Sequence, residues 1–145
     1  MGFWINLLTS RIFISVIVAL VLAQAGKVLV LSVKKRRFDA SLMARTGGMP
    51  SSHTAVVVAL TASIYYQEGV SALAIAAGTF AVIVVHDALT LRRAVGFQSE
   101  AINKIIKKMR VDYKRKLREL LGHNFTEVLI GGLLGYIVAY AVYSL

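Results

Sequence analysis

The chain has 145 residues, of which 57% are hydrophobic, and its mean hydropathy is +0.69. It nevertheless carries 17 Lys and Arg residues against 7 Asp and Glu, which gives a net charge of +10. This combination excludes a disordered basic tail, and the long apolar runs exclude an ordinary soluble nucleic-acid-binding domain. We therefore expect a single-domain integral membrane protein. Because the chain has no cysteine, disulfides, thiolate metal sites and cysteine nucleophiles are excluded as well.

Four apolar segments predict an all-α fold, an integral membrane four-helix bundle with spans at about 12–33, 50–67, 70–91 and 125–145. A helix needs about 20 apolar residues to cross the hydrocarbon core. The second segment reaches that length only if it begins near Pro50. The first segment permits another interpretation, a signal peptide cleaved after Ala23-Gln24-Ala25, against which the apolar run resumes at Val28.

Lys27 lies within the first span, about 9 Å from its end, and Lys34 returns to nearly the same face of the helix. A lysine this close to the interface either extends its amine toward the headgroups or binds a ligand. We interpret Lys27 as a candidate phosphate ligand and Lys34 as its support.

The basic residues are distributed unevenly along the chain. All of them except Arg11 and Lys27 fall in the connecting segments 34–49 and 92–124. Because cytoplasmic loops of membrane proteins collect Lys and Arg, we expect both segments in the cytoplasm and both termini outside. The expected location is the plasma membrane of a prokaryote.

The segment that leads into the second span reads Gly47-Gly48-Met49-Pro50-Ser51-Ser52-His53. Backbone amides at the start of a helix lack partners, so these amides and the hydroxyls of Ser51 and Ser52 would form an anion cradle. His53 could then donate a proton to the group that leaves the bound anion. A plain helix cap followed by an interfacial histidine fits the same pattern.

Charged groups also gather at the end of the third span. Asp87 precedes Arg92 and Arg93 by about one and a half helical turns, where a guanidinium could hold phosphate oxygens in a fork. Two arginines that end a membrane span are the alternative. We assign no role to His86.

The basic segment that follows contains a helical stripe of apolar residues at intervals of three or four, which predicts a basic amphipathic cytoplasmic helix. The stripe consists of Ile102, Ile106, Met109, Tyr113, Leu117 and Leu120. Contact with an anionic membrane surface is the favoured interpretation. A nucleic-acid contact or a dimerising coiled coil is the alternative, although we expect no nucleic-acid partner.

His123 and Glu127 share one face at the start of the last span. A carboxylate that accepts a hydrogen bond from one imidazole nitrogen leaves the other nitrogen free to attack, although a structural His-Glu bond has the same spacing. Three histidines on separate segments make a poor metal site, so we expect no metal. Gly131-x-x-x-Gly135 permits close helix packing within the chain or in a homo-oligomer.

With these residues in place, the chain resembles the type 2 phosphatidic acid phosphatase superfamily, which includes vanadium haloperoxidases, and most closely its small divergent branch. Three motifs carry the resemblance, namely Lys27 with Arg36, Pro50-Ser51-Ser52-His53, and His123-x-x-x-Glu127. Ser52 stands in place of the usual glycine and Glu127 in place of aspartate. No Ser-Arg pair precedes His123 at the usual distance, so Arg92 or Arg93 would supply that guanidinium.

The resemblance implies an integral membrane phosphatase that hydrolyses a lipid or polyprenyl phosphate monoester or diphosphate without a cofactor or metal. His123 would form a phosphohistidine, Glu127 would orient it, and His53 would protonate the leaving alcohol. Lys27, Arg36, the amides of Ser51 and Ser52 and an arginine would neutralise the phosphoryl oxygens. A phosphotransferase that uses the same residues and a non-enzymatic module that binds anionic lipid or a partner through its basic helix are the alternatives. Headgroup and chain type stay open.

Overall fold

The computed structural model describes residues 2–36, 48–110, 113, 117 and 121–145. Within these ranges the regular secondary structure is entirely helical, which confirms the predicted all-α class. The helices are α1 (Gly2–Thr9), α2 (Arg11–Lys35), α3 (Ser52–Glu68), α4 (Ala72–Leu89), α5 (Leu91–Met109) and α6 (Phe125–Ser144).

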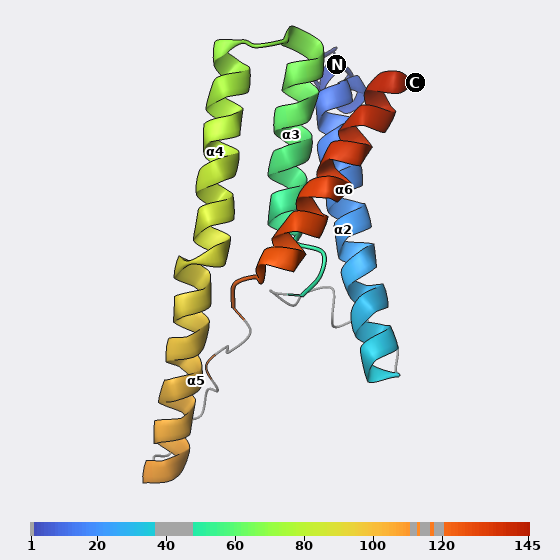
Figure 1. The fold of residues 1–145 in the computed structure, drawn as a ribbon. Helices are drawn as coiled ribbons and strands as arrows, with labels where there is room; N and C mark the ends of the chain where they lie inside the picture. The colour runs from blue at the N-terminus through green and yellow to red at the C-terminus, as the bar shows by residue number, and fades with distance from the viewer. Residues whose placement is uncertain (1, 37–47, 111–112, 114–116, 118–120) are drawn as a thin grey trace.

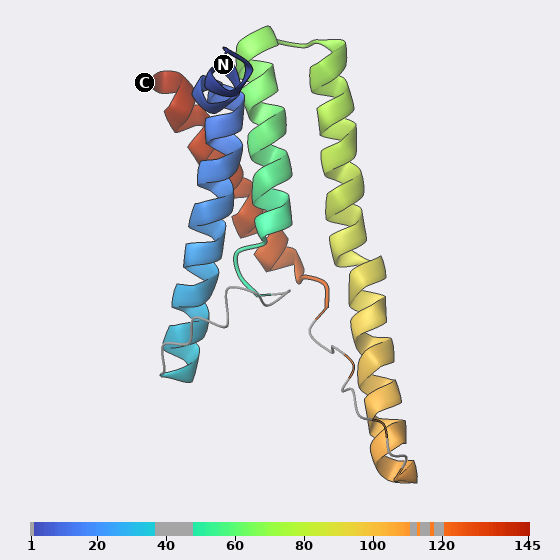
Figure 2. The ribbon, with the colours of Figure 1, turned by 180° about the vertical axis from the view of Figure 1, so that it is seen from behind.

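Helix α3 is the central element of the fold, because it packs against α2, α4 and α6 (Figure 1; Figure 2). Its contact with α2 is made by small side chains, Ala19 and Ala23 facing Ala55 and Ala59, all of them completely buried. Small residues let two helix backbones approach closely, which maximises van der Waals contact where water provides no driving force. Side chains carried by α3 therefore lie next to three other helices.

The contact between α3 and α6 depends on two glycines. A Cβ atom added to Gly131 would overlap the backbone of Ser51, and one added to Gly135 would overlap the carbonyl oxygen of Ala55. The predicted Gly-x-x-x-Gly packing thus occurs within the chain, where it holds α6 against α3.

Among the described residues, three helical stretches are long and apolar enough to cross a membrane, and they are Arg11–Val33, Ala72–Met109 and Phe125–Ser144. Membrane association is therefore supported, whereas a bundle of four spans is not confirmed. Helix α3 has 17 residues and a length of about 26 Å, slightly less than the hydrocarbon core of about 30 Å. Its crossing of the membrane stays a prediction.

The predicted basic amphipathic helix begins earlier and ends sooner than its stripe suggests. Helix α5 starts directly after Thr90, continues beyond α4, and ends at Arg110, which has a left-handed backbone with φ of 53° (Figure 1). Tyr113 and Leu117 lie outside the helix, and Leu120 lies outside the described residues. The Asn103 side chain binds both backbone groups of Leu117, at 2.9 and 3.1 Å, so Leu117 lies beside α5.

The two chain ends lie at the end of the molecule opposite to α5 (Figure 1). Tyrosine rings gather there, with Tyr66 at 5.6–6.4 Å from the rings of Tyr136, Tyr140 and Tyr143. Arg11 lies over the Tyr143 ring at 5.7 Å from its centre. Tyrosines concentrate where a membrane meets water, so this end has the composition of a membrane interface.

The glycine contact gives the first prediction. Gly135→Ala should destabilise the fold by about 1–3 kcal/mol, because the new methyl group must push α6 away from α3. The matched control is Gly132→Ala, whose methyl group would meet Thr54 and Val58 at 3.7 and 3.8 Å, an ordinary contact distance. Thermal unfolding in detergent, followed by circular dichroism, checks both variants. Equal melting temperatures for the two variants would contradict the close α3–α6 contact.

Candidate active site

Ser51 connects the start of α3 to the start of α6. Its hydroxyl accepts hydrogen bonds from the amide of Thr54 at 3.4 Å and from the Thr54 hydroxyl at 3.0 Å, which caps α3. Its amide donates to the carbonyl oxygen of Glu127 at 3.0 Å. Ser51 is completely buried. We expected its amide to bind an anion, but the structure uses that amide to hold the two helices together.

Lys27 lies at the centre of the site and does not extend toward the headgroups. Only 2% of its surface is exposed, and its aliphatic chain lies beside Gly48, which has a positive φ of 95°. Its amine donates to the Ser52 hydroxyl at 3.5 Å, and Glu127 acts on it electrostatically. A buried amine with these neighbours provides a fixed positive charge next to the start of α3.

The predicted pair of His123 and Glu127 is present. Their side chains form a hydrogen bond of 2.9 Å between Nδ1 and Oε2, and only 5% of His123 is exposed. With Glu127 ionised and His123 neutral, the carboxylate oxygen accepts from Nδ1–H and Nε2 keeps its lone pair. The same Glu127 oxygen accepts from the Asn124 amide at 3.2 Å, which fixes the carboxylate.

His53 and His123 lie opposite one another, with ring centres 6.5 Å apart and ring planes inclined by 59°. His53 is exposed, in contrast to the buried His123. Four neighbouring groups act electrostatically on the His53 ring, and they are Arg92, His123, Lys27 and Asp87. Residues from α2, α3, α4, α5 and the start of α6 thus converge on one place, as the sequence predicted.

The structure distinguishes the two candidate arginines. The Nε atom of Arg92 donates to a carboxylate oxygen of Asp87, which directs this guanidinium beside His53. Arg93 instead lies over the ring of Phe97, 5.6 Å from its centre. Both arginines are exposed, and Arg92 is the one whose charge acts on His53.

Three other predicted or unassigned residues are not brought to this place by the described contacts. Arg36 caps the far end of α2 and is exposed, about 13 Å along the helix from Lys27. Lys34 belongs to α2, but its side chain lies outside the described residues. His86 is exposed on α4 and interacts with the Thr90 hydroxyl at 3.4 Å.

Two contacts that support His123 were not predicted from the sequence. The His123 amide donates to the carbonyl oxygen of Ala88 at 3.0 Å, which ties the histidine to the end of α4. Gly122 has a positive φ of 85°, and a Cβ atom there would overlap the backbone of Arg93. A glycine just before a candidate nucleophile is a usable signal for such a close turn, whereas a carbonyl contact has no sequence signal.

The described residues were also examined as potential metal ligands. In the described part of the chain, no group of three His, Asp or Glu side chains could hold a metal ion. The chemistry available at this site is that of two imidazoles, two carboxylates, a buried amine and a guanidinium. Such a set can bind an oxyanion and transfer a proton.

Comparison of the sequence with known proteins places the chain in a family. The model of the "Divergent PAP2 family" matches residues 8–138. The chain belongs to the divergent PAP2 family. Among the relatives of this divergent PAP2 chain is the "Uncharacterized membrane protein YuiD" of Bacillus subtilis (strain 168), 37% identical over 148 aligned positions that cover 92% of this chain and 94% of the relative. No solved structure matches the chain.

The placement of the arginines generates a second prediction. Arg92→Ala should weaken the binding of orthovanadate or inorganic phosphate by roughly 10- to 100-fold, since a hydrogen bond to a charged group contributes about 1.5–3 kcal/mol. Arg93→Ala is the matched control and should bind as the unaltered protein does. Calorimetric titration of the purified proteins in detergent measures both. Equal weakening by the two substitutions would reject the assignment of Arg92.

Proposed function

We propose that this protein is an integral membrane phosphatase that hydrolyses a lipid or polyprenyl phosphate monoester or diphosphate through a phosphohistidine. The observation that carries the proposal is the His123–Glu127 hydrogen bond of 2.9 Å facing His53 across a ring distance of 6.5 Å. A nucleophile, the group that orients it and a proton donor are the minimum set for covalent phosphoryl transfer by an imidazole. Membership of the divergent PAP2 family supports a phosphatase-like chemistry.

The surrounding positive charges suit the phosphoryl group. Lys27 is bonded to Ser52, and Arg92 is held by Asp87 next to His53, so the two cations are directed by other side chains before any substrate binds. Fixed charges stabilise the developing charge of a transition state without reorganisation, and they do so more strongly where water is excluded. This preorganisation would account for most of the rate acceleration, because phosphoryl transfer is catalysed mainly by positioning and electrostatic stabilisation.

The first chemical step joins the enzyme and the phosphoryl group. The Nε2 lone pair of His123 attacks phosphorus, a P–N bond forms, and the P–O bond to the lipid alcohol breaks with its electron pair on oxygen. His53 donates a proton to that oxygen, so the alcohol leaves neutral. Glu127 keeps the proton on Nδ1 of His123 and stabilises the positive charge that the ring acquires.

The second step restores the enzyme. Water attacks the phosphorus of the phosphohistidine, the P–N bond breaks with its electrons returning to Nε2, and inorganic phosphate leaves. His53, which lost its proton in the first step, takes a proton from the attacking water. Both histidines then have their initial protonation, so the cycle consumes one water and produces one alcohol and one phosphate.

We further propose that the site faces the cytoplasmic leaflet of a prokaryotic plasma membrane. The site lies at the same end of the bundle as the start of the basic helix α5, whereas the tyrosine-rich end holds both termini (Figure 1). Cytoplasmic segments of membrane proteins collect Lys and Arg. A relative in Bacillus subtilis that is named as a membrane protein supports the location.

The activity prediction uses purified protein and a panel of lipid phosphates. His123→Ala should abolish phosphate release, because no other imidazole is oriented by a carboxylate in the described residues. His53→Ala should reduce release by about 100- to 10,000-fold, the usual contribution of a general acid. His86→Ala, the matched control, should keep full activity, since this histidine lies outside the site.

The same reaction mixtures test the intermediate and the acceptor. Labelled phosphate should be trapped on His123 by an alkaline quench, and alcohol and phosphate should be released in equal amounts. Alcohol in excess of phosphate would instead indicate transfer to another acceptor. If the unaltered protein and His123→Ala release phosphate equally, or neither does, the phosphatase proposal is wrong, and binding to anionic vesicles would then favour the non-enzymatic alternative.

The orientation is tested by thiol labelling, because the chain has no cysteine of its own. Val70→Cys lies in the exposed turn between α3 and α4, and Lys107→Cys lies on the exposed surface of α5. An impermeant maleimide added to intact cells should label the first variant, and it should label the second only after the cells are permeabilised. The reverse pattern would invert the proposed orientation.

A further inference from the structure

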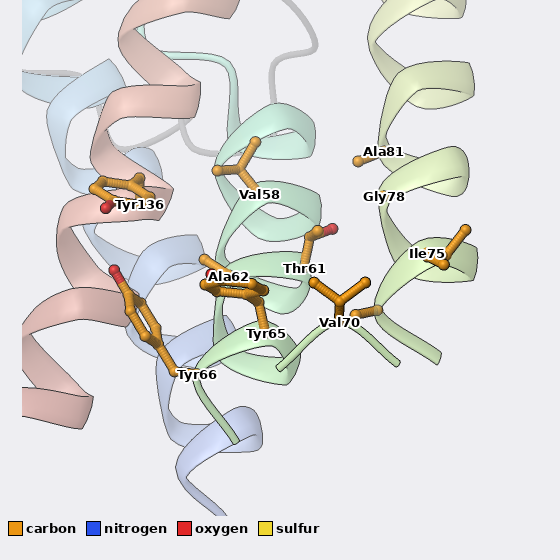
Figure 3. A pocket seen from close by; sticks show the side chains of 11 residues that line it. Val58, Thr61, Ala62, Tyr65, Tyr66, Val70, Ile75, Gly78, Ala81 and Tyr136 are labelled. Carbon is orange, nitrogen blue, oxygen red and sulfur yellow. The ribbon is translucent and has the colours of Figure 1, made fainter. Parts of the chain in front are cut away.

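Two apolar surfaces of the described residues differ in how a membrane can cover them. The first is a groove of about 570 Å³ over α3, between α4 and α6 (Figure 3). Its walls include Val58 and Ala62 of α3, Gly78 of α4 and Tyr136 of α6. Lipid tails are as apolar as leucine side chains, so lipid alone can fill a groove between membrane helices. The groove therefore requires no protein partner.

The second surface, the α5 stripe, runs along α5 from its first residue to its last. Its members are Leu91, Val95, Gln98, Ile102, Ile105 and Met109. All of them are exposed, and the exposed fraction of the apolar members lies between 44% and 68%. Another exposed apolar residue of the helix, Phe97, lies on a different face beneath the guanidinium of Arg93. The α5 stripe is thus a continuous apolar surface with one polar member.

Helix α5 lies beyond the part of the fold that lipid tails can cover. Helix α4 has 18 residues and a length of about 27 Å, close to the hydrocarbon core of about 30 Å. Helix α5 continues in line with α4, past the end of α3 (Figure 1; Figure 2), and contacts no other described helix. Its 19 residues extend for about 28 Å. With α4 in the membrane, most of the α5 stripe therefore lies in water, where an apolar surface of this kind marks an interaction site.

The other faces of α5 are already covered or are suited to water. Ser99 is buried and Asn103 binds Leu117, so the covered face lies roughly a third of a turn from the α5 stripe. Glu100 and Lys104 form an ion pair of 2.6 Å on the side that points away from the stripe. The α5 stripe is the face left for a partner.

The spacing within the α5 stripe indicates that this partner is another helix. The members of the stripe follow one another at alternating intervals of four and three residues, which is a period of 3.5. This heptad repeat is typical of helices that pair side by side in a coiled coil. A helix bound to an anionic bilayer surface lies in the plane of the membrane, whereas α5 continues the direction of α4 (Figure 1; Figure 2).

We propose that the α5 stripe pairs in parallel with the α5 stripe of a second copy of this chain. Copies inserted in one membrane share one orientation, so a two-fold axis between them runs along the membrane normal and makes the two α5 helices parallel. Each member of the stripe then meets its counterpart, with Val95 and Ile102 at the a positions, where β-branched residues favour two strands. Lys104 lies on the far side of each helix, which keeps its positive charge away from the axis.

The polar member of the stripe and the membrane itself support the pairing. Parallel pairing places Gln98 opposite its own counterpart, where two amide groups can hydrogen-bond across the axis. A single polar residue in such a seam fixes the register at a cost in stability. The 19 residues of α5 hold fewer than three heptads. Confinement of both copies to one membrane compensates for this short length, because it raises their effective concentration.

Cysteine crosslinking in intact membranes tests the pairing first, because the chain has no cysteine of its own. The stripe variants are Val95→Cys, Gln98→Cys, Ile102→Cys and Ile105→Cys. The matched controls are Lys104→Cys and Lys107→Cys, which are exposed on the far face. Mild oxidation or a short bismaleimide should join two copies through each stripe position, whereas the controls should give only the background of random collisions.

The pattern of crosslinks also reports the direction of the pairing. Parallel helices join each stripe position to itself at both ends of the stripe. Crosslinks at the middle positions alone would indicate antiparallel helices and would overturn the proposal, as would equal crosslinking of stripe and control positions. The absence of crosslinks at every stripe position would overturn it as well. Quenching of a fluorophore on Ile102→Cys by brominated anionic lipid would then assign the stripe to the bilayer surface.

Energy transfer between copies labelled at the chain terminus gives the second readout, as the protein is diluted in lipid vesicles. Ile102→Asp should weaken the pairing by about 100-fold or more, because two carboxylates would be buried opposite each other. Gln98→Leu should strengthen it by about tenfold, since an apolar pair replaces the polar one. Lys107→Gln is the matched control, because it changes the net charge by the same one unit as Ile102→Asp, and it should pair as the unaltered protein does.

The pairing is independent of the proposed phosphatase activity. His123→Ala should pair as the unaltered protein does, whatever the activity measurements give. Ile102→Asp should keep the helix content of the unaltered protein in circular dichroism, since Ile102 is exposed in the single chain. Equal dissociation constants for Ile102→Asp, Lys107→Gln and the unaltered protein would reject the α5 stripe as the interface.

Discussion

The contact between the start of α6 and the start of α3 sets the geometry on which the candidate site depends. The Ser51 amide donates to the carbonyl oxygen of Glu127, and Gly131 leaves room for the Ser51 backbone. Ser51 caps the helix that carries His53, and Glu127 directs His123. This backbone hydrogen bond and the missing side chain, together with the bond from the His123 amide to Ala88, position the two imidazoles relative to each other. Any residue larger than glycine at 131 would separate them.

The buried amine of Lys27 explains how so apolar a chain carries charge inside its fold. Burial of a cation is costly unless other groups compensate it. Here the Ser52 hydroxyl accepts from the amine and Glu127 opposes its charge, yet neither neutralises it by a direct ion pair in the described contacts. The amine has three N–H donors, and its contact with Ser52 uses one of them. The proposed role of Lys27 as a phosphate ligand requires such an amine, whereas a closed structural salt bridge would not provide it.

Much of the site could be predicted from the sequence, because its residues stand at helix ends that any bundle brings together. His53 and His123 are such residues, whereas Lys27 lies about two turns inside α2. The roles of individual groups could not be predicted. Whether Arg92 or Arg93 enters the site depends on the helix direction after Thr90, and the use of the Ser51 amide depends on the α6 contact. The predicted continuation of the amphipathic helix beyond Met109 was wrong, since the apolar periodicity does not reveal that Leu117 binds Asn103.

The division of the α3 surface links the excess of positive charge to the apolar composition. At its start, this helix contributes a serine and a histidine next to Lys27 and Arg92, and farther along it contributes valine, alanine and tyrosine to the groove. Glycines hold α6 close to α3, whereas small residues of α4, among them Ala74, Gly78 and Ala81, line the groove. The close contact with α6 fixes the polar end of α3, and the small residues of α4 leave the groove at its apolar end.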